Sequence, residues 1–166
     1  MSSSLDLTGR VAVVIGATSG LGRAIAIGLA QNGADVVASG RRQGCAEEVA
    51  SEIRALGRKA VAAPCDVADR TSLETLRDGA LAEFGHVDVL VNAAGYTFRK
   101  PTNDVTDSDW SDLFDTNLNG TLRACQTFYA SLKTSGHGRI INIASLSSYL
   151  AFHEVAAYCA SKTAVS

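Results

Sequence analysis

The sequence predicts an α/β fold built on a doubly wound parallel sheet. Short apolar runs rich in β-branched residues alternate with longer amphipathic stretches, three of which stop at a glycine. The short runs are apolar throughout, as in strands that helices cover on both faces. Parallel neighbours need right-handed crossovers, so strict alternation indicates helices on both sides of one sheet. With 166 residues, 46% of them hydrophobic, we expect a single domain over residues 1–166.

The elements follow from these runs in chain order. The expected strands are 10–15, 34–39, 59–63, 87–91 and 139–144. The expected helices are 21–32, 43–56 and 70–84, with stops at Gly33, Gly57 and Gly85. The connection 107–134 should be mainly helical, with a local irregularity where Asn117, Asn119 and Gly120 lower the helix propensity.

Composition excludes several classes of function. The formal charge is −2, without the basic block that would neutralise a nucleic-acid backbone. The N-terminus lacks a signal-peptide pattern and no apolar run reaches the length of a membrane span, so we expect a cytoplasmic protein without membrane contact. Four scattered cysteines and three histidines show no metal-ligand spacing, so we expect reduced cysteines and no metal.

A glycine loop, GATSGLG, directly follows the first expected strand and opens the first expected helix. Gly16, Gly20 and Gly22 allow a tight turn and a close approach to the backbone, and the helix N-terminus offers amide donors and a positive dipole end. The expected ligand is a nucleotide phosphate, contacted also by Thr18, Ser19 and Leu21. The alternative is a tightly packed strand-to-helix turn without a ligand.

The end of the second expected strand bears on the choice of nicotinamide cofactor. An acidic residue there would bind a ribose 2′-hydroxyl, whereas arginine would pair with a 2′-phosphate. Gly40 stands at this position, followed by Arg41 and Arg42. NADP(H) is therefore favoured and NAD(H) is the second choice, unless both arginines are solvated residues at a strand end.

Tyr158 and Lys162 are four residues apart in a segment expected to be helical from about residue 154. Residues at this spacing lie on one helix face, and an adjacent ammonium favours phenolate over phenol. Tyr158 is then a candidate acid or base near neutral pH. Taken alone, a tyrosine and a lysine at this spacing are more often surface residues of an amphipathic helix.

Together, the ordered motifs resemble the short-chain dehydrogenase/reductase family and span nearly the whole chain. The glycine spacing is GxxxGxG, with Ile15 where the family usually has threonine. VNAAG, residues 91–95, resembles the family's NNAG stretch. The matching residues are Gly16, Gly20, Gly22, Asp66, Asn92, Ala93, Ala94, Gly95, Asn117, Ser145, Tyr158 and Lys162.

The resemblance implies a Rossmann-like fold and a hydride-transfer reaction on a small carbonyl or alcohol substrate, without a metal. Tyr158 would exchange a proton with the substrate oxygen and Ser145 would hydrogen-bond that oxygen. Lys162 would hold the nicotinamide ribose and stabilise the phenolate, and Asn117 would position a water in a proton relay. The alternatives are a turn or cap role for Ser145 and a polar helix defect at Asn117.

The resemblance also assigns the adenine side of the cofactor site. Asp66 and Val67 would contact the adenine, unless Asp66 instead caps the helix that begins near Arg70. Residues 92–95 would let the cofactor lie close to the backbone. On the substrate side, candidate pocket residues are Tyr96, Phe98, Leu146, Tyr149, Phe152 and His153.

Family members continue well past the catalytic lysine, whereas this sequence stops at Ser166. We therefore expect a sheet truncated after the catalytic helix, lacking the usual C-terminal strands and substrate lid. The resemblance is to 3-oxoacyl reductases and to gluconate 5-dehydrogenase-like members, and it implies a homodimer or homotetramer if the remaining chain is present. The alternatives are a truncated dinucleotide-binding module or partial chain without efficient turnover, and an inactive fragment with no biological role.

Overall fold

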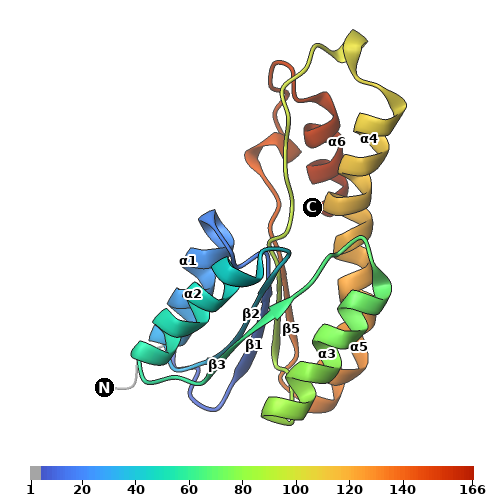
Figure 1. The fold of residues 1–166 in the computed structure, drawn as a ribbon. Coiled ribbons are helices and arrows are strands. Elements are labelled where there is room, and N and C mark those ends of the chain that lie inside the picture. The colour runs from blue at the N-terminus through green and yellow to red at the C-terminus, as the bar shows by residue number, and fades with distance from the viewer. Residues whose placement is uncertain (1–4) are drawn as a thin grey trace.

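The computed structural model describes residues 5–166 and contains a five-stranded, fully parallel sheet with the order β3-β2-β1-β4-β5 (Figure 1). The strands are β1 Val11–Ile15, β2 Asp35–Gly40, β3 Ala60–Pro64, β4 Val89–Asn92 and β5 Arg139–Asn142. Each begins and ends within about two residues of its predicted bounds, which confirms the doubly wound α/β prediction. The strand order reverses between β1 and β4, and such a reversal opens a crevice at the carboxyl ends of the strands.

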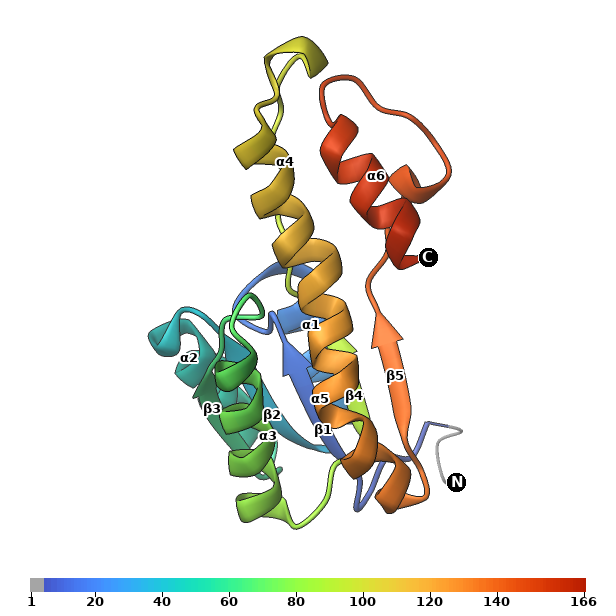
Figure 2. The same ribbon diagram turned by 90° about the vertical axis from the view of Figure 1, so that its right-hand side faces the viewer.

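Helices cover both faces of the sheet (Figures 1 and 2). Helices α1 Gly20–Gln31 and α2 Gln43–Ala55 pack on one face, in an apolar cluster that includes Ala26, Val49 and Ile53. Helices α3 Arg70–Phe84 and α5 Gly120–Ser135 pack on the other, around Leu73, Leu76 and Phe128. Helix α3 ends at Gly85, whose φ of 80° is the left-handed conformation that favours glycine.

The predicted irregularity in the long connection is a π-helical turn, Asp115–Asn119, between α4 Asp107–Phe114 and α5. A Cβ at Gly120 would lie 2.6 Å from Val67 Cγ2, so glycine lets this turn pack directly on the loop after β3. Arg123 donates to the Asp115 carboxylate over 2.6 Å and to the Asp115 carbonyl over 3.4 Å. The Arg123 guanidinium thus binds both the carbonyl and the carboxylate of Asp115, the first residue of the π-helical turn.

The remaining elements lie near the C-terminus and in the long loop after β4. They are helix α6 Ala156–Val165 and the 3₁₀ turns Thr102–Asp104 and Leu146–Ser148. In both views α6 lies beside α4, beyond the carboxyl ends of the strands (Figures 1 and 2).

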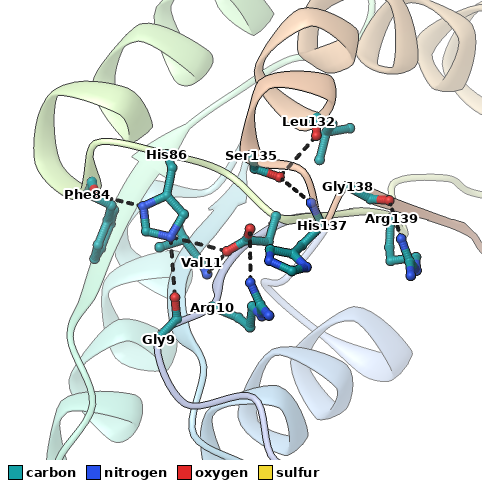
Figure 3. A network of polar contacts seen from close by, with 11 residues as sticks. Gly9, Arg10, Val11, Phe84, His86, Leu132, Ser135, His137, Gly138 and Arg139 are labelled. Carbon is teal, nitrogen blue, oxygen red and sulfur yellow. Dashed lines mark hydrogen bonds and ion pairs between the residues drawn. The ribbon is translucent and has the colours of Figure 1, made fainter.

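A polar network joins β1 and β4 at the opposite, amino end of the sheet (Figure 3). Asp88 is 1% exposed, and its Oδ2 accepts a 3.0 Å hydrogen bond from the Val11 N–H. Its carboxylate also lies 3.2 Å from His86 Nε2 and 3.8 Å from Arg10. A buried carboxylate is tolerated when it is paired and hydrogen-bonded in this way.

Strand β5 forms one edge of the sheet, and its neighbour is β4. Ile140 and Ile141 on this strand are each 42% exposed. Among residues 5–166 no helix is both long and apolar enough to cross a membrane, and no cluster of three or more potential metal ligands occurs. The four cysteines, all within the described range, are unpaired thiols.

Candidate active site

A cavity of about 720 Å³ lies at the carboxyl ends of the strands. Every strand contributes the residues that follow it, as expected for a ligand site in an open parallel sheet. Its lining includes the residues predicted to bind a cofactor, Gly16, Thr18, Ser19, Gly20, Leu21, Gly22, Arg41, Arg42, Asp66, Val67, Ala93, Ala94 and Gly95, and the predicted catalytic residues Ser145, Tyr158 and Lys162.

The glycine loop forms one wall of this cavity by close backbone packing. A Cβ at Gly16, where φ is 93°, would lie 2.5 Å from Ala94 N, and a Cβ at Gly22 would lie 2.2 Å from Gly16 O. Gly20 instead faces open space. Ser19 precedes α1 without making a side-chain capping bond, and the first turn of α1 contains no acidic residue. Neither the Ser19 side chain nor an acidic residue of the first turn therefore neutralises the positive end of the helix dipole, which faces the cavity.

A cationic group lies where the loop after β2 meets the glycine loop. Arg42 donates to Thr18 Oγ1 over 3.1 Å and to Ser19 Oγ over 3.2 Å. A Cβ at Gly40 would lie 2.7 Å from Thr18 Cγ2, so a larger residue there would displace the threonine side chain. The site therefore presents one guanidinium and two hydroxyls side by side, with the exposed Arg41 adjacent.

The loop after β3 places Asp66 and Val67 in the cavity wall. Asp66 is half-buried, and its Oδ1 accepts from the Ala68 N–H over 3.0 Å. The cap of α3 is Asp69, whose Oδ1 accepts from the Thr71 N–H over 2.9 Å. The helix-cap alternative for Asp66 is therefore wrong, because the residue that caps the helix lies three positions further on.

Residues 92–95 divide between two roles. Ala93, Ala94 and Gly95 line the cavity, whereas the side chain of Asn92 is 6% exposed and lies outside its lining. Asn92 donates to Asn142 Oδ1 over 2.9 Å and lies 3.4 Å from Cys125 Sγ, so it connects β4 to β5 and α5.

Tyr158 and Lys162 lie one turn apart on α6, with Lys162 Nζ 5.9 Å from the centre of the tyrosine ring. Lys162 is 6% exposed, and its Nζ donates a 2.6 Å hydrogen bond to the Ile143 carbonyl. Burial lowers the pKa of the Lys162 ammonium, because a charged group is disfavoured away from water. The ammonium is thus held between the end of β5 and the tyrosine.

Ser145 lies in the cavity wall, and its Oγ accepts from the Ser147 N–H over 3.1 Å. This is the turn role considered as an alternative. It leaves the Ser145 hydroxyl hydrogen available to another acceptor, since a hydroxyl can accept and donate at the same time.

Asn117 is fully buried within the π-helical turn and lies outside the cavity lining. Its Oδ1 accepts from the Tyr96 N–H over 3.0 Å, and its Nδ2 donates to the Tyr96 carbonyl over 3.0 Å and to Ser161 Oγ over 3.2 Å. A Cβ at Gly95 would lie 3.0 Å from Asn117 Oδ1 and 3.6 Å from Lys162 Nζ. The amide thus joins the loop after β4 to the helix that carries Tyr158.

Several lining residues were not among the sequence candidates: Cys65, Thr97, Thr116 and Ile143. Each lies next to a strand end or a motif residue, which is the signal that could have identified them. Of the six candidate substrate-side residues, Tyr96 and Leu146 line the cavity. The other four, Phe98, Tyr149, Phe152 and His153, lie outside its lining.

Three curated relatives are similar to almost all of this chain. D-threitol dehydrogenase of Mycolicibacterium smegmatis is 38% identical over 159 residues, which cover 96% of this chain and 61% of the relative. 2-Dehydro-3-deoxy-D-gluconate 5-dehydrogenase of Escherichia coli is 37% identical, with coverages of 98% and 64%. Gluconate 5-dehydrogenase of Gluconobacter oxydans is 38% identical, with coverages of 96% and 62%. The chain thus spans less than two thirds of the length of these relatives.

The fold agrees with a solved structure. A short-chain type dehydrogenase/reductase from Mycobacterium marinum superimposes with a TM-score of 0.93 at 31% identity, over 97% of this chain and 66% of that one. Residues 10–166 match the short chain dehydrogenase family. With its parallel sheet, glycine loop and Tyr158–Lys162 pair in one cavity, the chain belongs to the short-chain dehydrogenase family.

Proposed function

We propose that this chain forms the cofactor-binding and catalytic part of an NAD(P)(H)-dependent oxidoreductase that interconverts an alcohol and a carbonyl compound. The observation that carries the proposal is that Ser145, Tyr158 and Lys162 line the same cavity as the glycine loop and Arg42. The segments after β2 and β5 lie on opposite sides of β1 in the sheet order, so this cavity extends across the switch point.

The residues present fit a dinucleotide. The backbone around Gly20 is open and the N-terminus of α1 faces the cavity, which suits a pyrophosphate. Asp66 would accept a hydrogen bond from the adenine amine. Ala93, Ala94 and Gly95 would let the ligand lie against the backbone. When bound, the nicotinamide would supply the hydride donor or acceptor.

The protein's own residues would handle the proton. During reduction the Tyr158 hydroxyl would donate its proton to the carbonyl oxygen, and during oxidation Tyr158 would remove it from the alcohol. The Lys162 ammonium would stabilise the phenolate that forms. Ser145, whose Oγ already accepts from the Ser147 N–H, would donate its own hydrogen to the substrate oxygen.

Lys162 has hydrogens left for the cofactor and for a relay. An ammonium has three donors, and the Ile143 carbonyl takes one of them. A second hydrogen would bind the nicotinamide ribose hydroxyls. The third would bind the water that Asn117 is expected to position, and this water would connect Lys162 to solvent. Asn117 would also set the position of this water through the rigid amide contacts with Tyr96 and Ser161.

NADP(H) is our first choice of cofactor and NAD(H) the second. Arg42 lies against the Thr18 and Ser19 hydroxyls, and these three groups together with Arg41 would surround a 2′-phosphate. Charge-assisted hydrogen bonds of this kind are stronger than neutral ones. Gly40 provides no carboxylate to bind a 2′-hydroxyl.

The names of the relatives make D-threitol and gluconate the first alcohols to screen. The decisive experiment measures NAD(P)H absorbance at 340 nm with each cofactor, using the wild type and Tyr158→Phe. Turnover that Tyr158→Phe abolishes supports the oxidoreductase. Cofactor binding without turnover of any screened substrate supports the alternative, a dinucleotide-binding module.

The intact mass of the natural polypeptide tests whether strands and a lid follow residue 166. Size-exclusion chromatography with light scattering tests the expected homodimer or homotetramer.

A further inference from the structure

Glu154 is the one non-glycine residue among residues 5–166 with a left-handed backbone, at φ 61°. This conformation costs an L-residue roughly 1–2 kcal/mol. Such residues persist only where the surrounding structure holds them, and they concentrate at functional sites. Glu154 lies four residues before Tyr158 and two before the start of α6.

Helix α6 lacks the usual device that sets the direction of a helix N-terminus. In the described chain no side chain caps this end, and the preceding residue Val155 has φ −128° and ψ 36°. The turn at Glu154 is therefore the backbone feature next to this uncapped end that can set the direction in which α6 leaves the loop.

Lys100 holds that reversal in place. Its backbone N–H donates a 2.9 Å hydrogen bond to the Glu154 carbonyl, and its Nζ lies 2.5 Å from Asp109 Oδ2. Lys100 belongs to the loop that rises from β4 past α6 to reach α4 (Figure 1). One residue thus connects three segments that are far apart in sequence.

The other end of this connection is a well-anchored helix start. Thr106 and Asp109 form a capping box at α4, with Asp109 N to Thr106 Oγ1 at 3.1 Å and Thr106 N to Asp109 Oδ2 at 3.0 Å. The same carboxylate binds Lys100, and these contacts lower the pKa of Asp109 to about 2. It is therefore ionised throughout the physiological range.

We propose that Glu154, held in the left-handed conformation by Lys100, is a positioning residue that aims α6 and thereby sets Tyr158 against the cofactor cavity. Lys100 connects the capped start of α4 to the start of α6, because its side chain binds Asp109 and its N–H binds the Glu154 carbonyl. The backbone of Glu154 carries this role, and its carboxylate, which lies 3.2 Å from the exposed His153, does not. The proposal rests on the proposed function for its catalytic consequence only.

Three substitutions at this position separate backbone from side chain. Glu154→Ala removes the carboxylate and keeps the left-handed cost of an ordinary residue, while Glu154→Gly removes that cost. Glu154→Val makes the conformation a severe outlier, because a β-branched residue rarely adopts it. We expect kcat within about twofold of wild type for the alanine and glycine variants. We expect a loss of about tenfold or more for the valine variant, because misplaced reacting groups lower the rate steeply.

The Kd of 2′,5′-ADP, which lacks the nicotinamide ribose that Lys162 on α6 would hold, should stay unchanged in all three variants, since the glycine loop and Arg42 lie on other segments. A kcat loss without a change in Kd distinguishes misaimed Tyr158 from general destabilisation. Equal kcat in the valine and alanine variants would overturn the proposal. So would a large loss in the alanine variant, because the carboxylate would then carry the effect.

Hydrogen exchange gives a readout that does not depend on turnover. We expect the amides of residues 156–165 to exchange about tenfold faster in Glu154→Val than in Glu154→Ala, with β1 and β4 unchanged. Equal protection of α6 would overturn the proposal even if the wild type reduces no tested substrate. Failure of the proposed function, seen as no wild-type turnover, would leave this exchange test intact.

If Glu154→Val does not fold, Lys100→Met tests the same connection from the other side. It removes the ammonium that binds Asp109 and keeps the backbone N–H and most of the side-chain length. We expect faster exchange at the start of α6 and a kcat loss of roughly three- to fivefold. Lys133→Met, on the exposed end of α5, is the matched control and should change neither. Lys100→Met that behaves like this control would contradict the proposal.

Discussion

Lys162 donates a 2.6 Å hydrogen bond from Nζ to the carbonyl oxygen of Ile143, the residue that follows β5. The Ile143 N–H in turn donates to the Asn92 carbonyl over 3.0 Å. The Asn92 side chain also donates a hydrogen bond to Asn142 Oδ1, in the residue just before Ile143. The buried ammonium is therefore fixed to the sheet itself, and the register of β4 and β5 determines where it lies relative to Tyr158.

Tyr158→Phe should lower kcat by about 10²–10⁴-fold, because it removes the proton donor and keeps the ring. The cofactor Kd, measured by fluorescence titration, should remain within about twofold. Tyr129→Phe, on the exposed face of α5, is the matched control and should leave kcat unchanged. Substantial activity in Tyr158→Phe would mean that another group supplies the proton.

Lys162→Met should abolish turnover and at the same time change how stability depends on pH. Folding lowers the pKa of Lys162. At a pH between the lowered pKa and the ordinary lysine pKa, the unfolded chain therefore binds more protons than the folded chain. The contribution of Lys162 to wild-type stability therefore rises as pH rises through that window. The melting temperature of Lys162→Met minus that of wild type should accordingly fall as pH rises toward about 10.

The control for this measurement is Lys133→Met, which removes an exposed lysine of α5. Its melting-temperature difference from wild type should stay nearly constant over the same pH range. A Lys162→Met difference that also stays constant would contradict the assignment of a burial-shifted ammonium.

Arg42→Ala should weaken NADP(H) binding by about tenfold to a hundredfold, as expected for a lost charge-assisted contact of roughly 1.5–3 kcal/mol. Binding of NAD(H), which has no 2′-phosphate, should change by less than about twofold. Isothermal titration with both cofactors makes the comparison, and Arg139→Ala on the exposed edge strand is the control. Equal losses for both cofactors would show that Arg42 supports the loop and does not select the phosphate.

Asp88→Leu should lower the free energy of unfolding by about 3 kcal/mol or more, because it leaves the Val11 N–H and the Arg10 guanidinium without their buried partner. Since Asp88 lies at the amino end of the sheet, the cofactor Kd of the folded variant should not change. Urea unfolding measures the first effect and titration the second. Asp104→Leu, at an exposed position in the loop before α4, should have little effect on either.

Much of the fold could be predicted because its signals are local. Continuous apolar runs marked the strands, and Gly33, Gly57 and Gly85 marked three helix ends, all with positive φ in the structure. The break in the long helix was also predictable, since Asn117, Asn119 and Gly120 disfavour a regular helix. Its form was not, because the turn packs Gly120 against Val67, and a contact between residues so distant in sequence leaves no local signal.

The details of the site that escaped prediction depend on long-range contacts. The motifs marked the strand ends that meet at the cavity, but not the direction of individual side chains. Asn92 points toward Asn142 and Asn117 toward Tyr96, and neither direction follows from spacing along the chain. The left-handed residue before α6 was hidden for a simpler reason, because it is a glutamate and not a glycine.

The π-helical turn between α4 and α5 restricts which changes of chain length the protein can tolerate. The turn contains one residue more than an α-helix would need, and one residue corresponds to a rotation of about 100° around a helix axis. Deleting a single residue from 115–119 would permit an uninterrupted helix, but α4 would then rotate by this angle relative to α5. The Asp109 carboxylate would turn away from Lys100, although Thr116 is the one residue of this segment that lines the cavity. Outside Asn117, natural variants of this segment should therefore differ in sequence far more often than in length.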